Sequence, residues 1–475
     1  MGESSYDDTP YPVISFSESH PRRLQAVAHL LGLRAASPEN CRVLELGCAV
    51  GGNIVPMAYS LPASKCVGID LSAPQIERAR AFADAVGLKD KIDLRAASIT
   101  EITPEWGTFD YILCHGVFSW VPREVQEKTL AICGQQLSEG GVAYISFNVL
   151  PGWHTRTIIR EAMLFHTAGI TDPVQRARAG RDFVLALAES PSLTPEKQAM
   201  FQSEVRYLQG KPESYILHEY LEELNEPMYF RDFAARAAAH GLQYLGDAKH
   251  NVGLETNWEP ARRWGEACHD DIVRAEQYAD FAVGRMFRRA LLCRAGTALD
   301  RDGAAGRVGR LHAEALLRQW AHGAGSTRFE HPNGTRYVTQ SPAVRQALAG
   351  ISSAFPRAVR VSEVTGDAAN PEVAEAMLHC WRIGLIRLYV DPPMFATAPA
   401  EAPRATAVAR YLAARNEPVI NLRHETTGTS PAQRAVLPLL DGSRGRDQLA
   451  RDAGIGRDLL DQTLAQFATA ALLEA

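Results

Sequence analysis

The sequence predicts an α/β fold built on a parallel sheet of the doubly wound type. Short apolar segments alternate with amphipathic helical segments between residues 41 and 147, which is the pattern of consecutive βαβ units. The segment VLEL at 43–46 runs directly into a glycine-rich turn, as a buried strand does when it turns into a helix. A second short apolar segment, CVGID at 66–70, ends in an acid. These three observations indicate a ligand site at the carboxyl ends of the strands.

The elements follow from the spacing of apolar residues and from capping residues and glycines. We expect strands at 41–46, 65–70, 92–96, 109–114 and 142–147, the last after a turn at Gly140 and Gly141. We expect helices from Asn53, over 74–86 after the cap Ser72, and over 123–137.

The turn after the first strand is the part that indicates function. Gly47, Gly51 and Gly52 remove side chains where the backbone would approach a ligand, and the following helix offers unpaired N–H groups. Asp70 stands about twenty residues farther on, which is where a βαβ unit places an acid against ribose hydroxyls. Ala49 occupies the position of the second glycine of the dinucleotide fingerprint. A dinucleotide is therefore disfavoured.

The motifs ExGxxxGG, IDLS and FDYIL follow in order within about 70 residues. They resemble those of class I S-adenosylmethionine-dependent methyltransferases. The resemblance implies that Glu45 orients the loop, that 47–52 lies against the methionine part of the cofactor, and that Asp70 binds the ribose. Ser98 stands where relatives place an acid against the adenine, so a hydroxyl replaces the carboxylate there. The expected cofactor-binding residues are Tyr11, His20, Glu45, Gly47, Cys48, Ala49, Gly51, Asn53, Asp70, Leu71, Gln75, Ser98, Ile99, His115, Gly116 and Phe118.

The methyl acceptor would lie beyond the fourth and fifth strands. There the sequence provides the candidate catalytic residues His115, Trp120, Asn148 and Trp153. His115 is either a general base or a hydrogen-bonding partner of the cofactor's amino-acid part. Trp153 is expected to form a wall of the acceptor pocket and Asn148 to orient the acceptor. The NPPY-type signature of nucleic-acid amino methyltransferases is absent, which disfavours a base as acceptor.

An aromatic and proline-rich segment precedes the first helix. Tyr11, Phe16 and His20 are costly to leave in water if they stand in an irregular N-terminal segment. They form either a lid over the cofactor or an ordinary packing contact on the domain surface.

Domain boundaries follow from changes in pattern along the 475 residues, which are too many for a single core. We expect the methyltransferase core and its lid at 1–154 and 226–258, the latter supplying a helix at 229–240 and a strand at 242–245. Residues 155–225 form a helical insertion for dimer contact or substrate cover. The C-terminal part is mostly α, with a winged-helix-like middle domain at 259–400, helical over 277–292, and a winged-helix-like domain at 401–475.

The composition and charge of the chain restrict the classes of partner that we expect it to bind. The formal charge of −5 gives no basic footprint for nucleic acid. The eight cysteines form no CxxC pair, which favours reduced thiols over disulfides or a metal site. No apolar run reaches the ~18 residues of a membrane span, and the polar N-terminus lacks a signal-peptide core. We therefore expect a cytoplasmic protein without metal, nucleic-acid or membrane partners.

A wider resemblance covers most of the chain. It is carried by the motifs YDDTPYP, VLELGCAVGGN, VGIDLS, FDYILCHGVFSWVP, NVLPGWH, HEYLEELNEPMYF, HGLQYLGDA, NLRHE and LLDG. Together they resemble bacterial methyltransferases with a methyltransferase regulatory domain, including the rickettsial-type protein lysine methyltransferases.

This resemblance implies methyl transfer from S-adenosylmethionine to lysine side chains of a protein substrate. One alternative keeps the enzyme and changes the acceptor to a small molecule or a peptide natural product. A non-catalytic, cofactor-sensing interaction protein is an alternative of another class.

Overall fold

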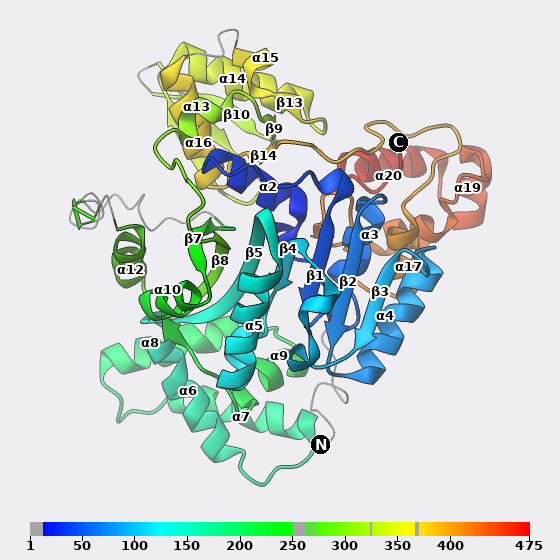
Figure 1. The fold of residues 1–475 in the computed structure, drawn as a ribbon. Helices are drawn as coiled ribbons and strands as arrows, with labels where there is room; N and C mark the ends of the chain where they lie inside the picture. Colours follow the sequence, from blue (N-terminus) through cyan, green and yellow to red (C-terminus); the bar gives the residue numbers. More distant parts are fainter. Residues whose placement is uncertain (1–12, 250–262, 265–266, 269–270, 324, 366–369) are drawn as a thin grey trace.

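A mixed sheet lies at the centre of the computed structural model, which describes residues 13–249, 263–264, 267–268, 271–323, 325–365 and 370–475 (Figure 1). Within these residues eight strands join in the order β3-β2-β1-β4-β5-β8-β7, with β6 paired to β5. The strands are β1 Arg42–Leu46, β2 Lys65–Asp70, β3 Ile92–Ala96, β4 Phe109–Cys114, β5 Leu137–Leu150, β6 Met228–Tyr229, β7 Leu242–Asp247 and β8 Phe287–Arg294. The predicted α/β class is confirmed.

Helices cover both faces of this sheet, as a doubly wound fold requires. Val43 of β1 packs with α2 Pro21–Leu30, α3 Ile54–Ser60 and α4 Ala73–Ala85. Its neighbour Leu44 packs on the opposite face with α5 Arg123–Gln136 and α10 Phe230–Ala239. Short 3₁₀ turns lie between these elements: η1 Ser17–Ser19, η2 Pro38–Asn40, η3 Ile99–Glu101, η4 Pro104–Trp106 and η5 Phe118–Trp120.

The predicted turn at Gly140 and Gly141 is wrong, because both glycines lie inside β5. The register between β4 and β5 shifts here: Phe109 pairs with Leu137, but Tyr111 pairs with Val142. Gly140 has φ +74°, and a Cβ at this position would lie 2.6 Å from the carbonyl oxygen of Arg34. The two glycines therefore allow an irregularity of the backbone within β5 and do not form a turn before the strand.

The predicted helix over 277–292 is wrong in its second half. Helix α12 Ile272–Val283 ends at Gly284, which is left-handed with φ +58°, and β8 then enters the sheet antiparallel between β5 and β7. Arg288 is fully buried in β8 and pairs with Asp280 at 2.8 Å. The charged Arg288 interrupts the apolar pattern of this buried strand, which is why the sequence did not indicate a strand here. The sheet therefore includes residues beyond 258, where we expected the core to end.

A helical region with a small core of its own follows β5. It contains α6 Gly152–His166, α7 Pro173–Ala188, α8 Pro195–Leu208, α9 Glu213–Ile216 and the π-helical turn η6 Leu217–Leu221. Ile159, Met163, Val184 and Tyr220 are buried there. This region lies below the sheet in Figure 1.

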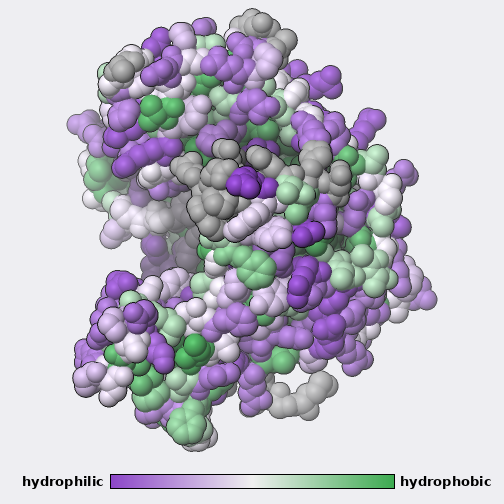
Figure 2. Space-filling model, turned by 90° about the vertical axis from the view of Figure 1, so that its left-hand side faces the viewer, coloured by the Kyte–Doolittle hydropathy of each residue, from purple (hydrophilic) through white to green (hydrophobic). Residues whose placement is uncertain are grey.

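The middle region packs on α2 above the sheet (Figure 1). Arg22 of α2 donates to the carbonyl of Asp391, and Gln25 donates to its carboxylate. The elements are α13 Ala304–Val308, β9 His312–Glu314, β10 Arg318–His322, β11 Ser326–Glu330, β12 Arg336–Thr339, α14 Pro342–Ala354, β13 Val359–Arg360, α15 Val361–Thr365, α16 Pro371–Arg382 and β14 Arg387–Tyr389. The winged-helix character expected for 259–400 stays a prediction. Figure 2 shows the left-hand side of Figure 1, where the surface is hollowed between the middle region above and the helical region below.

The C-terminal domain packs beside α3 and α4. Its elements are α17 Ala407–Ala414, β15 Val419–Ile420, β16 Thr426–Thr427, α18 Pro431–Val436, η7 Leu437–Leu439, α19 Arg446–Ala453 and α20 Arg457–Thr469. Tyr411 stacks on Phe82 of α4 with ring centroids 4.7 Å apart, and Ala407 N–H donates to the hydroxyl of Tyr59. None of the described helices is long and apolar enough to cross a membrane.

Candidate functional site

The turn after β1 is a bare backbone elbow. The N–H groups of Gly47 and Cys48 both donate to the carbonyl of Ile69, at 2.9 and 2.8 Å. Gly47 has φ +79°, and a Cβ there would lie 2.4 Å from a methyl group of Val117. Only glycine fits at this position, because both the conformation and the space exclude a side chain.

Asp70 is fixed at the end of β2 by two backbone donors. The Ala49 N–H lies 2.9 Å from one carboxylate oxygen and the Ser72 N–H 3.0 Å from the other. Ala49 adopts φ +47° to reach this position. A carboxylate oxygen can accept more than one hydrogen bond. The predicted juxtaposition of the glycine loop and Asp70 is therefore present.

Glu45 lies at the base of the elbow, buried at the end of β1. Asn53 Nδ2 donates to its Oε1 at 2.6 Å, and its Oε2 has no hydrogen-bond partner among the described residues. Burial raises the pKa of Glu45 to about 7, against the lowering effect of the Asn53 hydrogen bond. A buried acceptor without a donor suits a ligand that carries a cationic N–H group.

Asn53 is the N-cap of α3, yet its side chain makes no capping bond and turns toward Glu45. Its Oδ1 accepts the backbone N–H of Phe16 at 3.0 Å. Ser19 lies beside the amide, with its Oγ 3.1 Å from Nδ2. A Cβ on Gly52 would lie 2.9 Å from backbone atoms of Ile14. The described part of the N-terminal segment therefore packs directly on the glycine loop.

The lid residues have different outcomes. Phe16 stacks on His115 with ring centroids 3.5 Å apart, whereas Tyr11 lies outside the described residues. Both ring nitrogens of His20 are engaged within the protein, and its role as a cofactor-binding residue stays a prediction. Nδ1 accepts the Arg22 N–H, which caps α2, and Nε2 lies 3.0 Å from Ser60 Oγ.

His115, after β4, lies under Phe16 with its Nδ1 2.7 Å from the hydroxyl of Tyr144. Burial lowers the pKa of His115 to about 3 and raises the pKa of Tyr144 well above its usual range. Both groups are therefore neutral at physiological pH. The direction of the hydrogen bond between Nδ1 and the Tyr144 hydroxyl depends on which ring nitrogen of His115 carries the proton.

Glu18 and Arg289 belong to this cluster but are missed by sequence reasoning. They form an ion pair at 2.6 Å, with side chains 19% and 23% exposed. Arg289 also lowers the pKa of His115, while Glu18 raises it. Arg289 is carried by β8, which the sequence presents as a helix. No local sequence pattern indicates that Arg289 lies at this site.

Other cofactor candidates lie at the expected strand ends. Gly116 N–H donates to Ser146 Oγ at 2.8 Å. The Ser98 hydroxyl caps the short helix η3, accepting from Thr100 N–H at 3.2 Å. Among the remaining cofactor candidates, Leu71 follows Asp70 and its side chain is 70% exposed. The side chains of Cys48, Gln75 and Ile99 are buried.

Three predicted aromatic site residues differ in their burial. Phe118 is fully buried against Phe147 and Phe233, and a contact of Phe118 with the cofactor stays a prediction. Trp153 is also buried, with Arg156 over its ring at 5.4 Å, and forms no open wall. Trp120 is half-buried and packs edge-to-face with Trp153, with ring centroids 6.2 Å apart.

Asn148 is buried near the end of β5, and its side-chain amide is engaged by Asn225. Its Nδ2 donates to Asn225 Oδ1 at 3.1 Å, and its backbone N–H donates to Ser119 Oγ at 2.9 Å. Glu226 N–H also donates to the Ser119 carbonyl. Asn148 thus joins η5 to the segment before β6.

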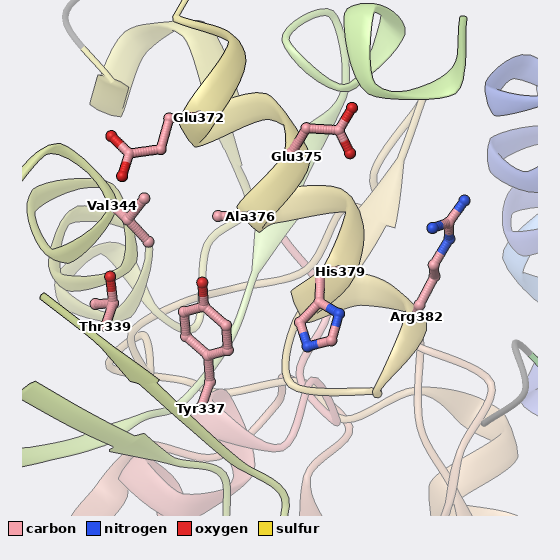
Figure 3. Close-up of a pocket in the computed structure, with 8 residues that line it drawn as sticks. All are labelled: Tyr337, Thr339, Val344, Glu372, Glu375, Ala376, His379 and Arg382. Carbon is pink, nitrogen blue, oxygen red and sulfur yellow. The ribbon is translucent and has the colours of Figure 1, made fainter. Parts of the chain in front are cut away.

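A separate pocket of about 400 Å³ lies in the middle region, between β12 and α16 (Figure 3). The Tyr337 and His379 rings lie 5.6 Å apart there. Glu372 and Glu375 project from α16 above them. The remaining lining residues are Thr339, Val344, Ala376 and Arg382. None of these residues belongs to the glycine-loop crevice. Within the described residues, no group of His, Cys, Asp and Glu has the arrangement of a metal site.

Family models match three segments of the chain. A methyltransferase domain matches 43–141, a predicted methyltransferase regulatory domain matches 212–294, and a PKMT C-terminal winged helix domain matches 401–453. The second match runs from α9 through β8 and so includes the antiparallel strand β8 of the sheet.

Two proteins of Rickettsia prowazekii are similar in sequence. The uncharacterized protein RP789 is 40% identical over 300 residues, which cover 62% of this chain and 54% of that protein. The uncharacterized protein RP028 is 38% identical over 244 residues, which cover 51% of this chain and 96% of that protein. The chain thus spans only about half the length of RP789 but nearly all of RP028.

The solved structure of PKMT2 from Rickettsia typhi in complex with AdoHcy is similar over the whole molecule. Its TM-score is 0.86 at 27% identity, covering 98% of this chain and 100% of that one. AdoHcy, S-adenosylhomocysteine, is the demethylated form of S-adenosylmethionine. The elbow, the fixed Asp70 carboxylate and the unpartnered Glu45 oxygen fit the same ligand here. The chain therefore belongs to the S-adenosylmethionine-dependent methyltransferases that carry a methyltransferase regulatory domain and a PKMT-type C-terminal winged helix.

Proposed function

We propose that this methyltransferase modifies lysine side chains of a protein substrate. The observation that carries the proposal is the similarity to PKMT2 across 98% of the chain. The shared architecture includes the helical region, the middle region and the winged helix as well as the catalytic core. Domains beyond the core favour an acceptor that is itself large, since a small molecule needs only a pocket.

Four residues would hold the cofactor. Gly47 allows the backbone to approach the methionine part, and Asp70 accepts the ribose hydroxyls. Glu45 accepts from the α-ammonium group through its unpartnered oxygen, while Asn53 keeps its carboxylate oriented. When bound, the cofactor supplies a methyl group activated by a sulfonium; a neutral lysine amine bonds to this methyl carbon in line as the C–S bond breaks, and S-adenosylhomocysteine is the leaving group.

The acceptor side would be formed by Phe16, His115 and Glu18. A lysine must lose its proton before it can attack, and a desolvated pocket lowers its pKa. The stacked rings of Phe16 and His115 supply such a surface. Burial lowers the pKa of His115 to about 3, which makes it a weak base and favours the hydrogen-bonding role over the general-base role. The Glu18 carboxylate would attract the incoming ammonium before it loses its proton.

Contacts with other chains are proposed for the helical region. Its exposed apolar residues include Ile158 and Phe165 on α6, which are 52% and 83% exposed, and Val174 and Leu185 on α7. Exposed apolar side chains grouped on neighbouring helices are typical of protein contact surfaces. They support either of the uses expected for 155–225, dimer contact or substrate cover.

The acceptor can be identified by transfer of a deuterated methyl group to a cell lysate, followed by mass spectrometry of peptides, RNA and metabolites. We expect the label on lysine Nζ atoms of protein, with none transferred by the Asp70→Ala variant. Label confined to RNA or to a metabolite would contradict the lysine assignment. No label in any fraction would favour a non-catalytic protein.

Replacing Asp70 with alanine should weaken the binding of S-adenosylhomocysteine. Hydrogen bonds to a charged group contribute about 1.5–3 kcal/mol, so the Kd should rise roughly 10- to 150-fold. Isothermal titration calorimetry measures the change. Asp84→Ala is the matched control, because Asp84 is an exposed carboxylate on α4 away from the loop, and its Kd should equal that of the wild type. An unchanged Kd for Asp70→Ala would refute the ribose assignment.

Binding should also depend on the ionisation of Glu45. Burial raises its pKa from 4.5 to about 7, so ionisation of Glu45 destabilises the free protein as the pH rises through that range. A cationic ligand favours the ionised form and is therefore bound more weakly below pH 7. We expect the calorimetric Kd to be roughly eightfold higher at pH 6 than at pH 7.5. Glu45→Gln should remove this dependence. A variant that keeps the same pH slope would show that another group titrates.

A further inference from the structure

A loop of the C-terminal domain reaches the cofactor site. Residues 421–425 connect β15 to β16, and His424 Nε2 lies 2.8 Å from Asn53 Oδ1, across 371 residues of sequence. Ser15 Oγ donates to the carbonyl of His424 at 3.1 Å. His424 is only 1% exposed. The contact therefore lies inside the interface between the winged helix and the methyltransferase core.

The direction of this hydrogen bond can be assigned. Phe16 N–H donates to Asn53 Oδ1, and Asn53 Nδ2 lies 2.6 Å from a Glu45 carboxylate oxygen, so the amide has a single orientation that satisfies both contacts. Oδ1 can only accept, and Nε2 of His424 must therefore carry the proton. Burial lowers the pKa of His424 to about 3. The ring is thus neutral, with its Nδ1 lacking a partner among the described residues.

The loop is built to present this ring. His424 has φ +61°, a left-handed conformation that is unfavourable for a residue other than glycine. Asn421 stabilises it, because its Oδ1 accepts from the N–H groups of Arg423 and Glu425, each at 2.9 Å. Arg423 in turn pairs with the buried Glu314 of β9 at 2.6 Å. Strained backbone held by several bonds is typical of functional positions.

We propose that His424 is a positioning residue of the cofactor site, contributed by the C-terminal winged helix. Its Nε2–H holds the Asn53 amide, which in turn orients Glu45 toward the ligand. This inference rests on the cofactor site proposed above. Since the same contact joins two domains, cofactor binding and docking of the winged helix stabilise each other.

The test compares three variants of the full-length chain by calorimetry with S-adenosylhomocysteine. His424→Ala removes the donor and should raise the Kd at least tenfold. His424→Gln replaces the ring N–H with an amide N–H and should stay within about threefold of the wild type. Ser15→Ala is the matched control, because it removes a contact to the same loop without touching Asn53. Its Kd should also stay within about threefold.

The outcomes separate the proposal from its rivals. Wild-type affinity in a folded His424→Ala variant would overturn it. Equal weakening in all three variants would assign the effect to docking of the loop and overturn the role of the ring N–H. If Asp70→Ala also binds normally, the cofactor site itself is wrong. Should His424→Ala not fold, hydrogen exchange of the wild-type chain decides: residues 421–426 should exchange more slowly with ligand, and no change would overturn the coupling.

Discussion

The side-chain amide of Asn53 is the constraint on which the site depends. One end of it donates to Glu45 and the other accepts from the backbone of Phe16 and the ring of His424. Three segments distant in sequence therefore meet at one buried group. Removing any one of these partners would leave buried polar atoms with fewer hydrogen bonds, which is costly away from water. The network thus stabilises a single arrangement of loop, lid and winged helix.

This arrangement explains why a methyltransferase core is embedded in so much additional structure. Helix α2 joins the sheet to the middle region through Asp391, while α3 and α4 contact the C-terminal domain through Tyr59 and Phe82. Tyr59 lies on α3, the helix that follows the glycine loop. Changes in domain packing can therefore reach the cofactor site through rigid, directly packed elements.

Much of the core could be predicted because its signals are local. Alternating apolar segments gave the strands β1 to β4, and glycine chemistry with strand-end spacing placed Gly47 beside Asp70. Strand β8 could not be found, because the fully buried Arg288 disguises it and its partner Asp280 is recognisable only in the folded chain. Nothing in the local pattern separates Phe118, which is buried in the core, from Phe16, which stacks on His115. The role of His424 depends on a contact across 371 residues, and only the NLRHE motif of the family resemblance hinted that its loop matters.

We propose that the crevice between Glu45, Gly47 and Asp70 holds the cofactor while His424 remains on Asn53. A crystal structure with S-adenosylhomocysteine tests this most directly. We expect the ribose on Asp70, the amino-acid part against the Gly47 turn with its ammonium group near Glu45, and the His424–Asn53 hydrogen bond intact. Ligand bound elsewhere, or a His424 side chain withdrawn from Asn53 when the ligand is present, would contradict it.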